Sequence, residues 1–502
     1  MIKHNASRHA LLGLVFATSL GTLIVQPAIA DNAAATPADH SAPAQATPAL
    51  GSNLQTLKEL DGKAPARRAL NIQTWKTAEG AKVLFVESRE LPMFDLRLTF
   101  AAGSSQDQNA PGIATLTNAM LNEGVEGKDV TAIAQGFEGL GADFGNGAYR
   151  DMAVASLRSL SAADKREPAL KLFSEVLGKP TFPADSLTRI KNQLLASFEY
   201  QKQNPGVIAS KALFDQVYGD HPYAHPSDGT AESIGAIDIP QLKAFHAKAY
   251  AAGNAVIALV GDLSREEAQA VAAQVSSALP KGPALPKTAT PTEPKAGLTH
   301  IEFPSNQTHL MLAQLGIERN DPDYPALTVG NSILGGGGFG SRLMTEVREK
   351  RGLTYGVSSN FTAMQVRGPF LIGLQTRADM SQNTLKLVQD IVRDFLAKGP
   401  TQKEVDDVKR ELTGSFPLTA ASNAAIVGQL GAIGFYNLPL TYLEDYMTQA
   451  QAVTVEQVKA AMNKHLSADK MVVVTVGPTV AQKELPAPTD HPVQQPAAVP
   501  EH

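Results

Sequence analysis

The sequence predicts an α+β fold built from two homologous domains, each a mainly antiparallel sheet with helices packed on one face. Strand-like segments such as Lys82–Glu87 and Phe94–Phe100 lie beside longer amphipathic stretches typical of helices. The segment Lys191–Phe198 is followed 218 residues later by the similar Lys409–Phe416, and buried-strand patterns at 256–261 and 472–477 are 216 residues apart. Nearly constant offsets indicate a duplicated domain of about 200 residues. Neighbouring strands mixed with helices indicate α+β layers.

Composition limits the classes of protein to which the chain can belong. Its 502 residues, 43% of them hydrophobic and 19% charged, are enough for two or more globular domains. A formal charge of −5 offers no basic stripe that could neutralise phosphates, so we expect no nucleic-acid partner. The absence of cysteine from the sequence excludes disulfides and thiolate metal sites.

The N-terminal segment is typical of a secretory signal peptide. Lys3 and Arg8 precede an apolar run over 10–25, and the small-x-small site Ala28-Ile29-Ala30 follows. The alternative, a membrane anchor, fits less well because the run is shorter than the ~20 residues that span a bilayer. We therefore expect a periplasmic or secreted protein with no membrane span after signal cleavage.

Composition shifts divide the rest of the chain. Two Pro-rich stretches, near the middle and at the C-terminus, and an Ala/Pro-rich one after the signal peptide contain few large apolar residues. The predicted organisation is a signal peptide (1–30), a disordered tether (31–66), an N-terminal domain (67–280), a linker (281–297), a C-terminal domain (298–480) and a tail (481–502).

A helix predicted over Gly112–Glu123 carries the first family resemblance. Its setting, from Ala102-Gly-Ser-Ser to Met120-Leu…Gly124, resembles the zinc helix of the insulinase/pitrilysin peptidases. That family has the motif H-x-x-E-H there, with two histidines on Zn²⁺ and the glutamate as general base. The corresponding positions in this chain are Thr115, Asn118 and Ala119, and the family's third ligand corresponds to Ser197. The resemblance thus implies a degenerate zinc site.

The chemistry of these side chains supports that implication. An amide cannot accept a proton from water near neutral pH, and alanine has no donor atom. Glu199 lies two residues beyond Ser197, which on a helix turns it away by about 200°. His221 and His225 have i, i+4 spacing, but Pro222 prevents the regular helix that would bring both rings to one face. We expect no metal and no cofactor in this chain.

The C-terminal half carries a more specific motif. The segment Asn331–Val357 resembles the family's C-terminal-domain motif, in which a Gly-rich turn and a helix precede an Arg and a Tyr seven residues apart. The matching residues are Arg348 and Tyr355, and the turn, expected to lie near substrate, includes Gly335, Gly336, Gly337 and Gly338. We expect Ser341 to cap the helix, Gly352 to end it, and Tyr355 to begin a strand over 353–361.

The resemblance implies that the two side chains act on a peptide held at the zinc of a facing domain. A guanidinium can hold a peptide carbonyl, and a phenol can donate to the oxyanion, a contact typically worth ~10²–10³ in rate. The structural alternative is that Arg348, Lys350 and Arg351 offset the helix dipole and Tyr355 is a half-buried strand residue. Gly335–Gly340 also fits G-x-G-x-x-G, but it follows a helix-like segment rather than a strand, so we expect no nucleotide site.

Loss of the zinc positions together with retention of the Arg/Tyr pair is similar to the family's split enzymes, including the alpha subunit of mitochondrial processing peptidase. We therefore expect the non-metal subunit of a periplasmic heterodimeric zinc peptidase, whose partner is a homologous subunit that carries H-x-x-E-H and zinc. Its substrate would be an unfolded polypeptide lying against a sheet edge. The alternative is a catalytically inert scaffold or peptide-binding protein, and a third possibility is a self-sufficient metallopeptidase.

Overall fold

The computed structural model describes residues 70–489, which belong to one compact unit of the chain, Arg68–His502. The predicted signal peptide (1–30) and tether (31–66) lie outside the described residues, as does the tail beyond residue 489. The described part contains two large, mainly antiparallel sheets with helices packed against them, so the predicted fold class is confirmed.

The first sheet belongs to the N-terminal half and has six strands. Only β2 and β8 pair in parallel; the other neighbours are antiparallel. In spatial order the strands are β1 (Gln73–Lys76), β2 (Lys82–Glu87), β8 (Ala255–Gly261), β3 (Met93–Phe100), β7 (Ala153–Leu160) and β6 (Asp143–Ala148). The helices of this half are α1 (Ile113–Ala119), α2 (Val130–Glu138), α3 (Ala163–Gly178), α4 (Ala184–Gln201), α5 (Pro205–Tyr218), α6 (Ala231–Ala236), α7 (Ile239–Ala249) and α8 (Arg265–Ala278), and a short ribbon pairs β4 (Gly124–Val125) with β5 (Lys128–Asp129).

The second sheet follows a stretch, residues 280–296, that forms neither helix nor strand. Its parallel pair is β9 with β13, and the other neighbours are antiparallel. The spatial order is β9 (Gly297–Glu302), β13 (Val472–Gly477), β10 (Gln307–Leu315), β12 (Pro369–Arg377) and β11 (Val357–Phe361). The α-helices of this half are α9 (Tyr324–Asn331), α10 (Ser381–Lys398), α11 (Gln402–Ser415), α12 (Asn423–Phe435), α13 (Tyr442–Ala452) and α14 (Val455–His465).

The two sheets repeat the same strand order. Setting β1 aside, the order β2-β8-β3-β7-β6 corresponds strand by strand to β9-β13-β10-β12-β11, and each sheet places its parallel pair at the same point. The sequence repeat falls on α4 and α11, which follow equivalent helices α3 and α10. The duplication predicted from the offsets is therefore visible in the topology.

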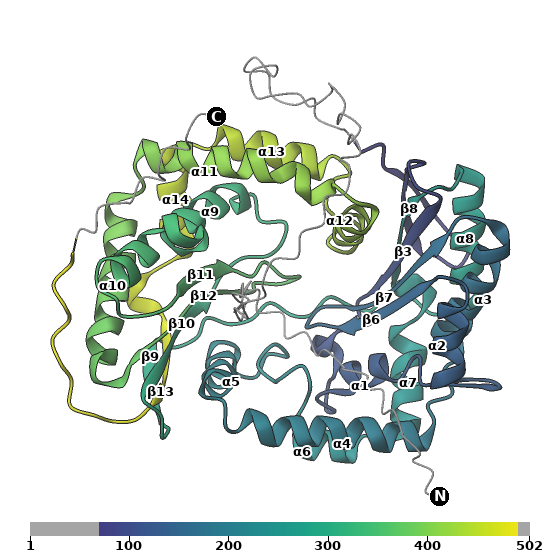
Figure 1. The fold of residues 1–502 in the computed structure, drawn as a ribbon, viewed down its shortest axis with the longest axis horizontal. Helices are drawn as coiled ribbons and strands as arrows, with labels where there is room; N and C mark the ends of the chain where they lie inside the picture. The colour runs from purple at the N-terminus through teal and green to yellow at the C-terminus, as the bar shows by residue number, and fades with distance from the viewer. Residues whose placement is uncertain (1–69, 490–502) are drawn as a thin grey trace, which may run out of the picture. The chain divides into compact units, whose positions relative to one another are not determined.

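One helix of each half packs against the sheet of the other half (Figure 1). Helix α12 packs on β8, β3 and β2 of the first sheet, and α5 packs on β13 and β10 of the second. The central strands β8 and β13 are buried along their whole length, which explains why both read as continuous apolar runs. One face is covered by helices of the same half and the other face by the helix from the opposite half.

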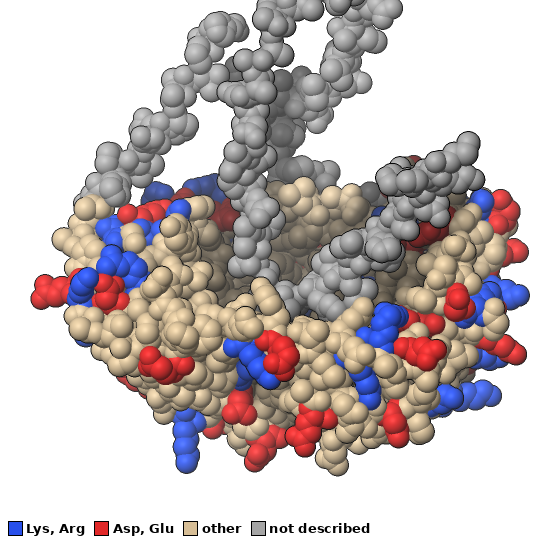
Figure 2. Space-filling view, turned by 60° about the horizontal axis from the view of Figure 1, so that its bottom comes forward, with Lys and Arg blue, Asp and Glu red and all other residues tan. Residues whose placement is uncertain are grey.

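The surface shown in Figure 2 has Lys and Arg side chains interspersed with Asp and Glu rather than gathered in a stripe. Within residues 70–489, no single helix is long and apolar enough to cross a membrane. The bent pair Gln402–Ala420 and Asn423–Phe435 together meets the criteria of length and composition, with a bend of 101°.

Candidate functional site

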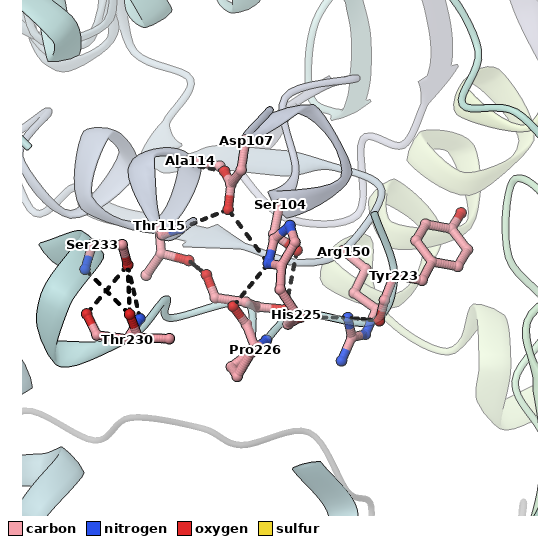
Figure 3. Close-up of polar contacts among 12 residues, drawn as sticks. Ser104, Asp107, Ala114, Thr115, Arg150, Tyr223, His225, Pro226, Thr230 and Ser233 are labelled. Carbon is pink, nitrogen blue, oxygen red and sulfur yellow. Dashed lines mark hydrogen bonds and ion pairs between the residues drawn. The ribbon is translucent and has the colours of Figure 1, made fainter. Parts of the chain in front are cut away.

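Helix α1, which carries three of the four degenerate zinc positions, begins at a left-handed glycine and is held by a buried carboxylate. Gly112 has φ 92°, and a Cβ there would lie 2.8 Å from a backbone oxygen. Asp107 accepts hydrogen bonds from the N–H groups of Gly112 (2.7 Å) and Ala114 (3.0 Å). Figure 3 shows Asp107 beside Ala114 at the start of the helix. Burial raises the pKa of Asp107 to about 7, although these two hydrogen bonds act against the rise.

The two positions that correspond to zinc-binding histidines hold side chains engaged elsewhere. The hydroxyl of Thr115 donates to the carbonyl oxygen of Ser227 over 2.8 Å (Figure 3). The methyl group of Ala119 packs against the apolar cluster between α1 and α4, which includes Leu116 and Leu194. Thr115 thus makes a hydrogen bond to a loop, and Ala119 makes an apolar packing contact.

The position of the general base is occupied by a buried, hydrogen-bonded amide. Asn118 is 3% exposed, and its side-chain nitrogen donates to the carbonyl oxygen of Val154 (3.3 Å) and to the hydroxyl oxygen of Tyr250 (3.1 Å). Burial raises the pKa of Tyr250, so this phenol stays protonated. Asn118 ties α1 to β7 and to the end of α7, which is a structural role.

The third-ligand position lies on α4, as predicted, and has no carboxylate. The hydroxyl of Ser197 accepts a hydrogen bond from the amide of Gln201 over 3.3 Å. Glu199 is exposed and pairs with Lys202 at 2.6 Å, so it points away from α1, in agreement with the expected rotation. Together, the hydroxyl–amide–methyl set on α1 and the hydroxyl on α4 do not fit zinc.

The two candidate histidines are also engaged in local contacts, and the segment that holds them forms no helix. His221 lies between the carbonyl oxygen of Ala289 (2.7 Å) and the N–H of Tyr223 (3.1 Å). His225 lies 3.1 Å from the carbonyl oxygen of Pro226 and 3.9 Å from Asp107 (Figure 3). Burial lowers the pKa of both histidines. Each ring therefore has a structural explanation.

One group of three potential metal ligands is present in the described part of the chain, in the C-terminal half. Asp321, Asp323 and His465 bring their ligand atoms within 4.8 Å of one another. Lys464 already contacts Asp323 at 2.6 Å, and His465 contacts the same carboxylate at 2.9 Å. The side-chain hydrogen bond from Lys464 holds the pKa of Asp323 below its usual value, so the group is an ion-pair cluster.

The segment predicted as a Gly-rich turn is largely helical: Gly335 and Gly336 end the π-helical segment Ser332–Gly336, which continues α9, and Gly338 begins the 3-10 helix Gly338–Gly340. The glycines therefore follow a helix and not a strand, as the sequence indicated. A Cβ on Gly335 would lie 2.6 Å from the hydroxyl of Ser359, on Gly336 2.4 Å from the amide of Asn331, and on Gly337 2.6 Å from a backbone oxygen. Gly338 has φ 62°. A side chain at Gly335, Gly336 or Gly337 would therefore lie too close to neighbouring atoms, whereas Gly338 has open space around it and is favoured by its positive φ. Their predicted proximity to substrate remains a prediction.

Arg348 lies in the last turn of the π-helical segment Met344–Glu349 and has no carboxylate partner among the described residues. Its guanidinium carbon lies 4.6 Å from the centre of the Phe339 ring, a cation–π distance. Phe339 is itself 63% exposed. Arg348 is thus held over an exposed aromatic side chain with its N–H groups available.

The neighbouring basic side chains are paired, which separates them from Arg348. Lys350 and Arg351 both contact Glu346, at 2.7 and 2.8 Å. Arg342 makes a bidentate contact with Glu404, at 2.7 and 2.8 Å. Arg348 thus differs from Lys350 and Arg351 in having no ion-pair partner among the described residues, while its place in the last turn of the segment also suits the helix dipole named in the structural alternative.

Tyr355 lies elsewhere than the sequence predicted. The strand begins at Val357, so Tyr355 does not begin it but lies in the loop that precedes it, where it is 85% exposed. The loop forms because Thr354 bonds the backbone of Gly356 in place of a ladder contact. Ser341 also differs from expectation: its hydroxyl donates backwards to Gly338 rather than accepting from the helix. Among described residues, the Tyr355 hydroxyl has no hydrogen-bond partner.

Two residues of this site were missed at the level of sequence. Phe339 supports Arg348, and an aromatic residue between two glycines of a turn is a feature that could have identified it. Asp107 fixes α1, and its position five residues before Gly112 is compatible with many loop conformations.

Comparison with known proteins agrees with this architecture. A family model described as insulinase (peptidase family M16) matches residues 82–231, and one described as the peptidase M16 inactive domain matches residues 236–412. The chain belongs to peptidase family M16.

Within that family, this chain is similar to a peptidase M16 inactive domain from Pseudomonas fluorescens whose crystal structure is known. The two sequences are 77% identical, and the match covers 83% of this chain and 100% of the other, with a TM-score of 0.81. A protein named non-peptidase homolog YmxG, from Helicobacter pylori, is 28% identical over 76% of this chain and 88% of its own length. An uncharacterized zinc protease YmxG from Bacillus subtilis is 24% identical over 71% of this chain and 86% of its own length. With side chains unsuited to zinc at all four family positions, this chain by itself is a catalytically inert member of family M16.

Proposed function

We propose that this chain is the non-metal subunit of a periplasmic or secreted zinc peptidase complex. In this complex, Arg348 and Tyr355 act on a peptide bound at the zinc of a homologous H-x-x-E-H subunit. The observation that carries the proposal is that the exposed Tyr355 hydroxyl and the half-buried Arg348 guanidinium have no hydrogen-bond or ion-pair partner among the described residues. The other basic residues of the same segment are bound to carboxylates.

The chemistry follows from what each side chain can offer. The guanidinium of Arg348, stacked on Phe339, presents N–H donors that can hold a peptide carbonyl in place. The hydroxyl of Tyr355 can donate to the oxyanion that forms when water attacks that carbonyl. Neither step requires a general base in this chain, which matches the buried amide at Asn118.

The test is to mix the purified chain with a zinc-bearing family member and measure cleavage of an internally quenched peptide. We expect each chain alone to be inactive, the mixture to be active, and Arg348→Ala to reduce the activity of the mixture at least ten-fold. Arg351→Ala is the matched control, because that arginine is paired with Glu346 and should leave the rate within about two-fold. A mixture that forms a stable complex without cleavage, or with cleavage indifferent to Arg348, supports the inert-scaffold alternative instead.

A further inference from the structure

Arg97 of strand β3 lies on the face of the first sheet that receives α12. Its strand neighbours Leu96 and Leu98 point into the main core of the N-terminal half, so Arg97 and Thr99 point to the opposite face. A Cβ on Gly431 of α12 would lie 3.1 Å from the Arg97 side chain and 3.3 Å from the hydroxyl of Thr99. The glycine therefore leaves the space that these two side chains occupy.

The positive charge of Arg97 has no partner in the described part of the chain. No hydrogen bond or ion pair joins its guanidinium to another described residue, and its Nε is buried without an acceptor. Burial lowers the pKa of Arg97, and the phenol of Tyr149 is the one group that acts in the other direction. The hydroxyl of Thr99, which is 1% exposed, is also without a partner.

Other arginines of the same region are satisfied, so Arg97 is unusual within its own surroundings. Arg158 on the adjacent strand β7 binds Asp95 of β3 in a two-point contact, at 2.9 and 3.3 Å. Arg150 donates to the carbonyl oxygens of Tyr223 and His225. A partly buried guanidinium with no counter-charge is costly, because desolvation of the ion is not offset by any interaction within the chain.

We infer that Arg97, with Thr99 beside it, forms a binding site for a carboxylate supplied by a ligand. A planar guanidinium matches a carboxylate in a two-point contact, and a neighbouring hydroxyl can add a third donor. Arg97 retains partial exposure, so its outer N–H groups can be reached from solvent. Tyr149, which is 45% exposed, lies near enough for its phenol to act on the pKa of Arg97.

The carboxylate is that of a peptide, a step which rests on the proposed function as a peptidase subunit. Two sources share this chemistry: the C-terminal carboxylate of a polypeptide and the side chain of an Asp or Glu within it. The first would align a substrate from its end, and the second would select acidic segments. The anion site itself requires neither zinc nor cleavage.

The test is calorimetric titration of the purified full chain with three unlabelled decapeptides of one neutral sequence. The first has a free C-terminal carboxylate, the second a C-terminal amide, and the third an amide and one internal Glu. We expect at least one carboxylate-bearing peptide to bind ten-fold or more tightly than the neutral amide. Which of the two does so identifies the source.

Variants separate this role from a structural one. Arg97→Met should abolish the preference for carboxylate and raise the melting temperature of the unliganded chain, because the unpaired charge is gone. Arg97→Lys should keep part of the preference. Arg393→Met removes the same charge from surface ion pairs with Asp390 and Asp469 and should retain the preference fully.

Equal binding of all three peptides, no binding of any, or an unchanged preference in Arg97→Met would overturn the inference. These results do not depend on a partner subunit. A complex that cleaves peptides while the isolated chain shows no carboxylate preference rejects the site alone. A preference for carboxylate without cleavage in any mixture rejects the catalytic proposal alone.

Discussion

The side-chain nitrogen of Asn118 lies 3.1 Å from the hydroxyl oxygen of Tyr250, which is 132 residues further along the chain. This contact occupies the position where active members of the family keep their general base. A second bond from the same nitrogen reaches Val154. The position has therefore changed from a chemical role to a structural one, and the cost of altering it can be measured.

Substitution Asn118→Ala should lower the free energy of unfolding by about 1–3 kcal/mol, because it leaves buried partners without a donor. Asn118→Glu should be worse at pH 8 than at pH 5. The buried carboxyl will have a folded-state pKa above its unfolded value, so its ionisation opposes folding as pH rises. Urea unfolding at both pH values measures the effect. Asn192→Ala, at an exposed site on α4, is the control and should change stability by less than about 0.5 kcal/mol. An equally small effect at Asn118 would contradict its structural role.

The raised pKa of Asp107 leads us to expect that the free energy of unfolding depends on pH. Its pKa is raised by burial to about 7 in the folded chain, against an ordinary value of 3.8. The folded state therefore binds the proton more tightly than the unfolded state does. The contribution of Asp107 to the free energy of unfolding is fully present below pH ~4 and is lost as the pH rises toward 7. The loss is at most ~1.4 kcal/mol per pH unit.

The measurement is the difference in unfolding free energy between wild type and Asp107→Asn across pH 4–8. His225, 3.9 Å away, has its pKa lowered by burial and acts in the opposite direction, but it is present in both proteins. We expect the difference to change between pH 4 and 7 and to level off above. A difference that is flat over this range would show that Asp107 titrates normally.

The third prediction concerns helix α12, which packs against the sheet of the opposite half. A Cβ on Gly434 would lie 2.3 Å from Val256 and 2.8 Å from Leu84, both in the first sheet. Gly434→Ala should therefore cost about 1–3 kcal/mol through overpacking. Gly428→Ala on the same helix meets nothing within 4 Å and should stabilise by about 0.5–1 kcal/mol through helix propensity. Thermal unfolding distinguishes the two, and equal effects would mean that α12 is not tightly packed on that sheet.

Local patterns in the sequence predicted the strands and the duplication well. Strands β2 and β13 have the predicted bounds, and β3 and β8 differ by one residue at their start. These predictions succeed because the alternation of apolar and polar residues, and uninterrupted apolar runs, involve only residues that are adjacent in the sequence. The helix expected over Gly112–Glu123 is present as α1 and carries Thr115, Asn118 and Ala119, but it ends at Ala119, four residues earlier than predicted.

Long-range relationships could not be predicted from those patterns. The exchange of α5 and α12 depends on which of two apolar sheet faces each helix covers, and both helices have suitable residues. The partners of Asn118 and the lack of a partner for Arg97 likewise depend on strands and helices brought together only by the fold. The position of Tyr355 outside its strand was missed because the hydroxyl of Thr354 makes two hydrogen bonds to the backbone of Gly356, a local contact that the strand pattern does not show.

Tyr355→Phe provides the sharpest test of the catalytic proposal, because it removes one hydroxyl from a residue that is 85% exposed. Stability should change by less than about 0.5 kcal/mol. In the active mixture kcat should fall by ~10²–10³ while KM changes little, since an oxyanion exists in the transition state and not in the bound substrate. Tyr200→Phe, equally conservative and also on the surface, should leave both constants unchanged. If Tyr355→Phe raises KM and spares kcat, the hydroxyl binds substrate and the oxyanion must be stabilised by other groups.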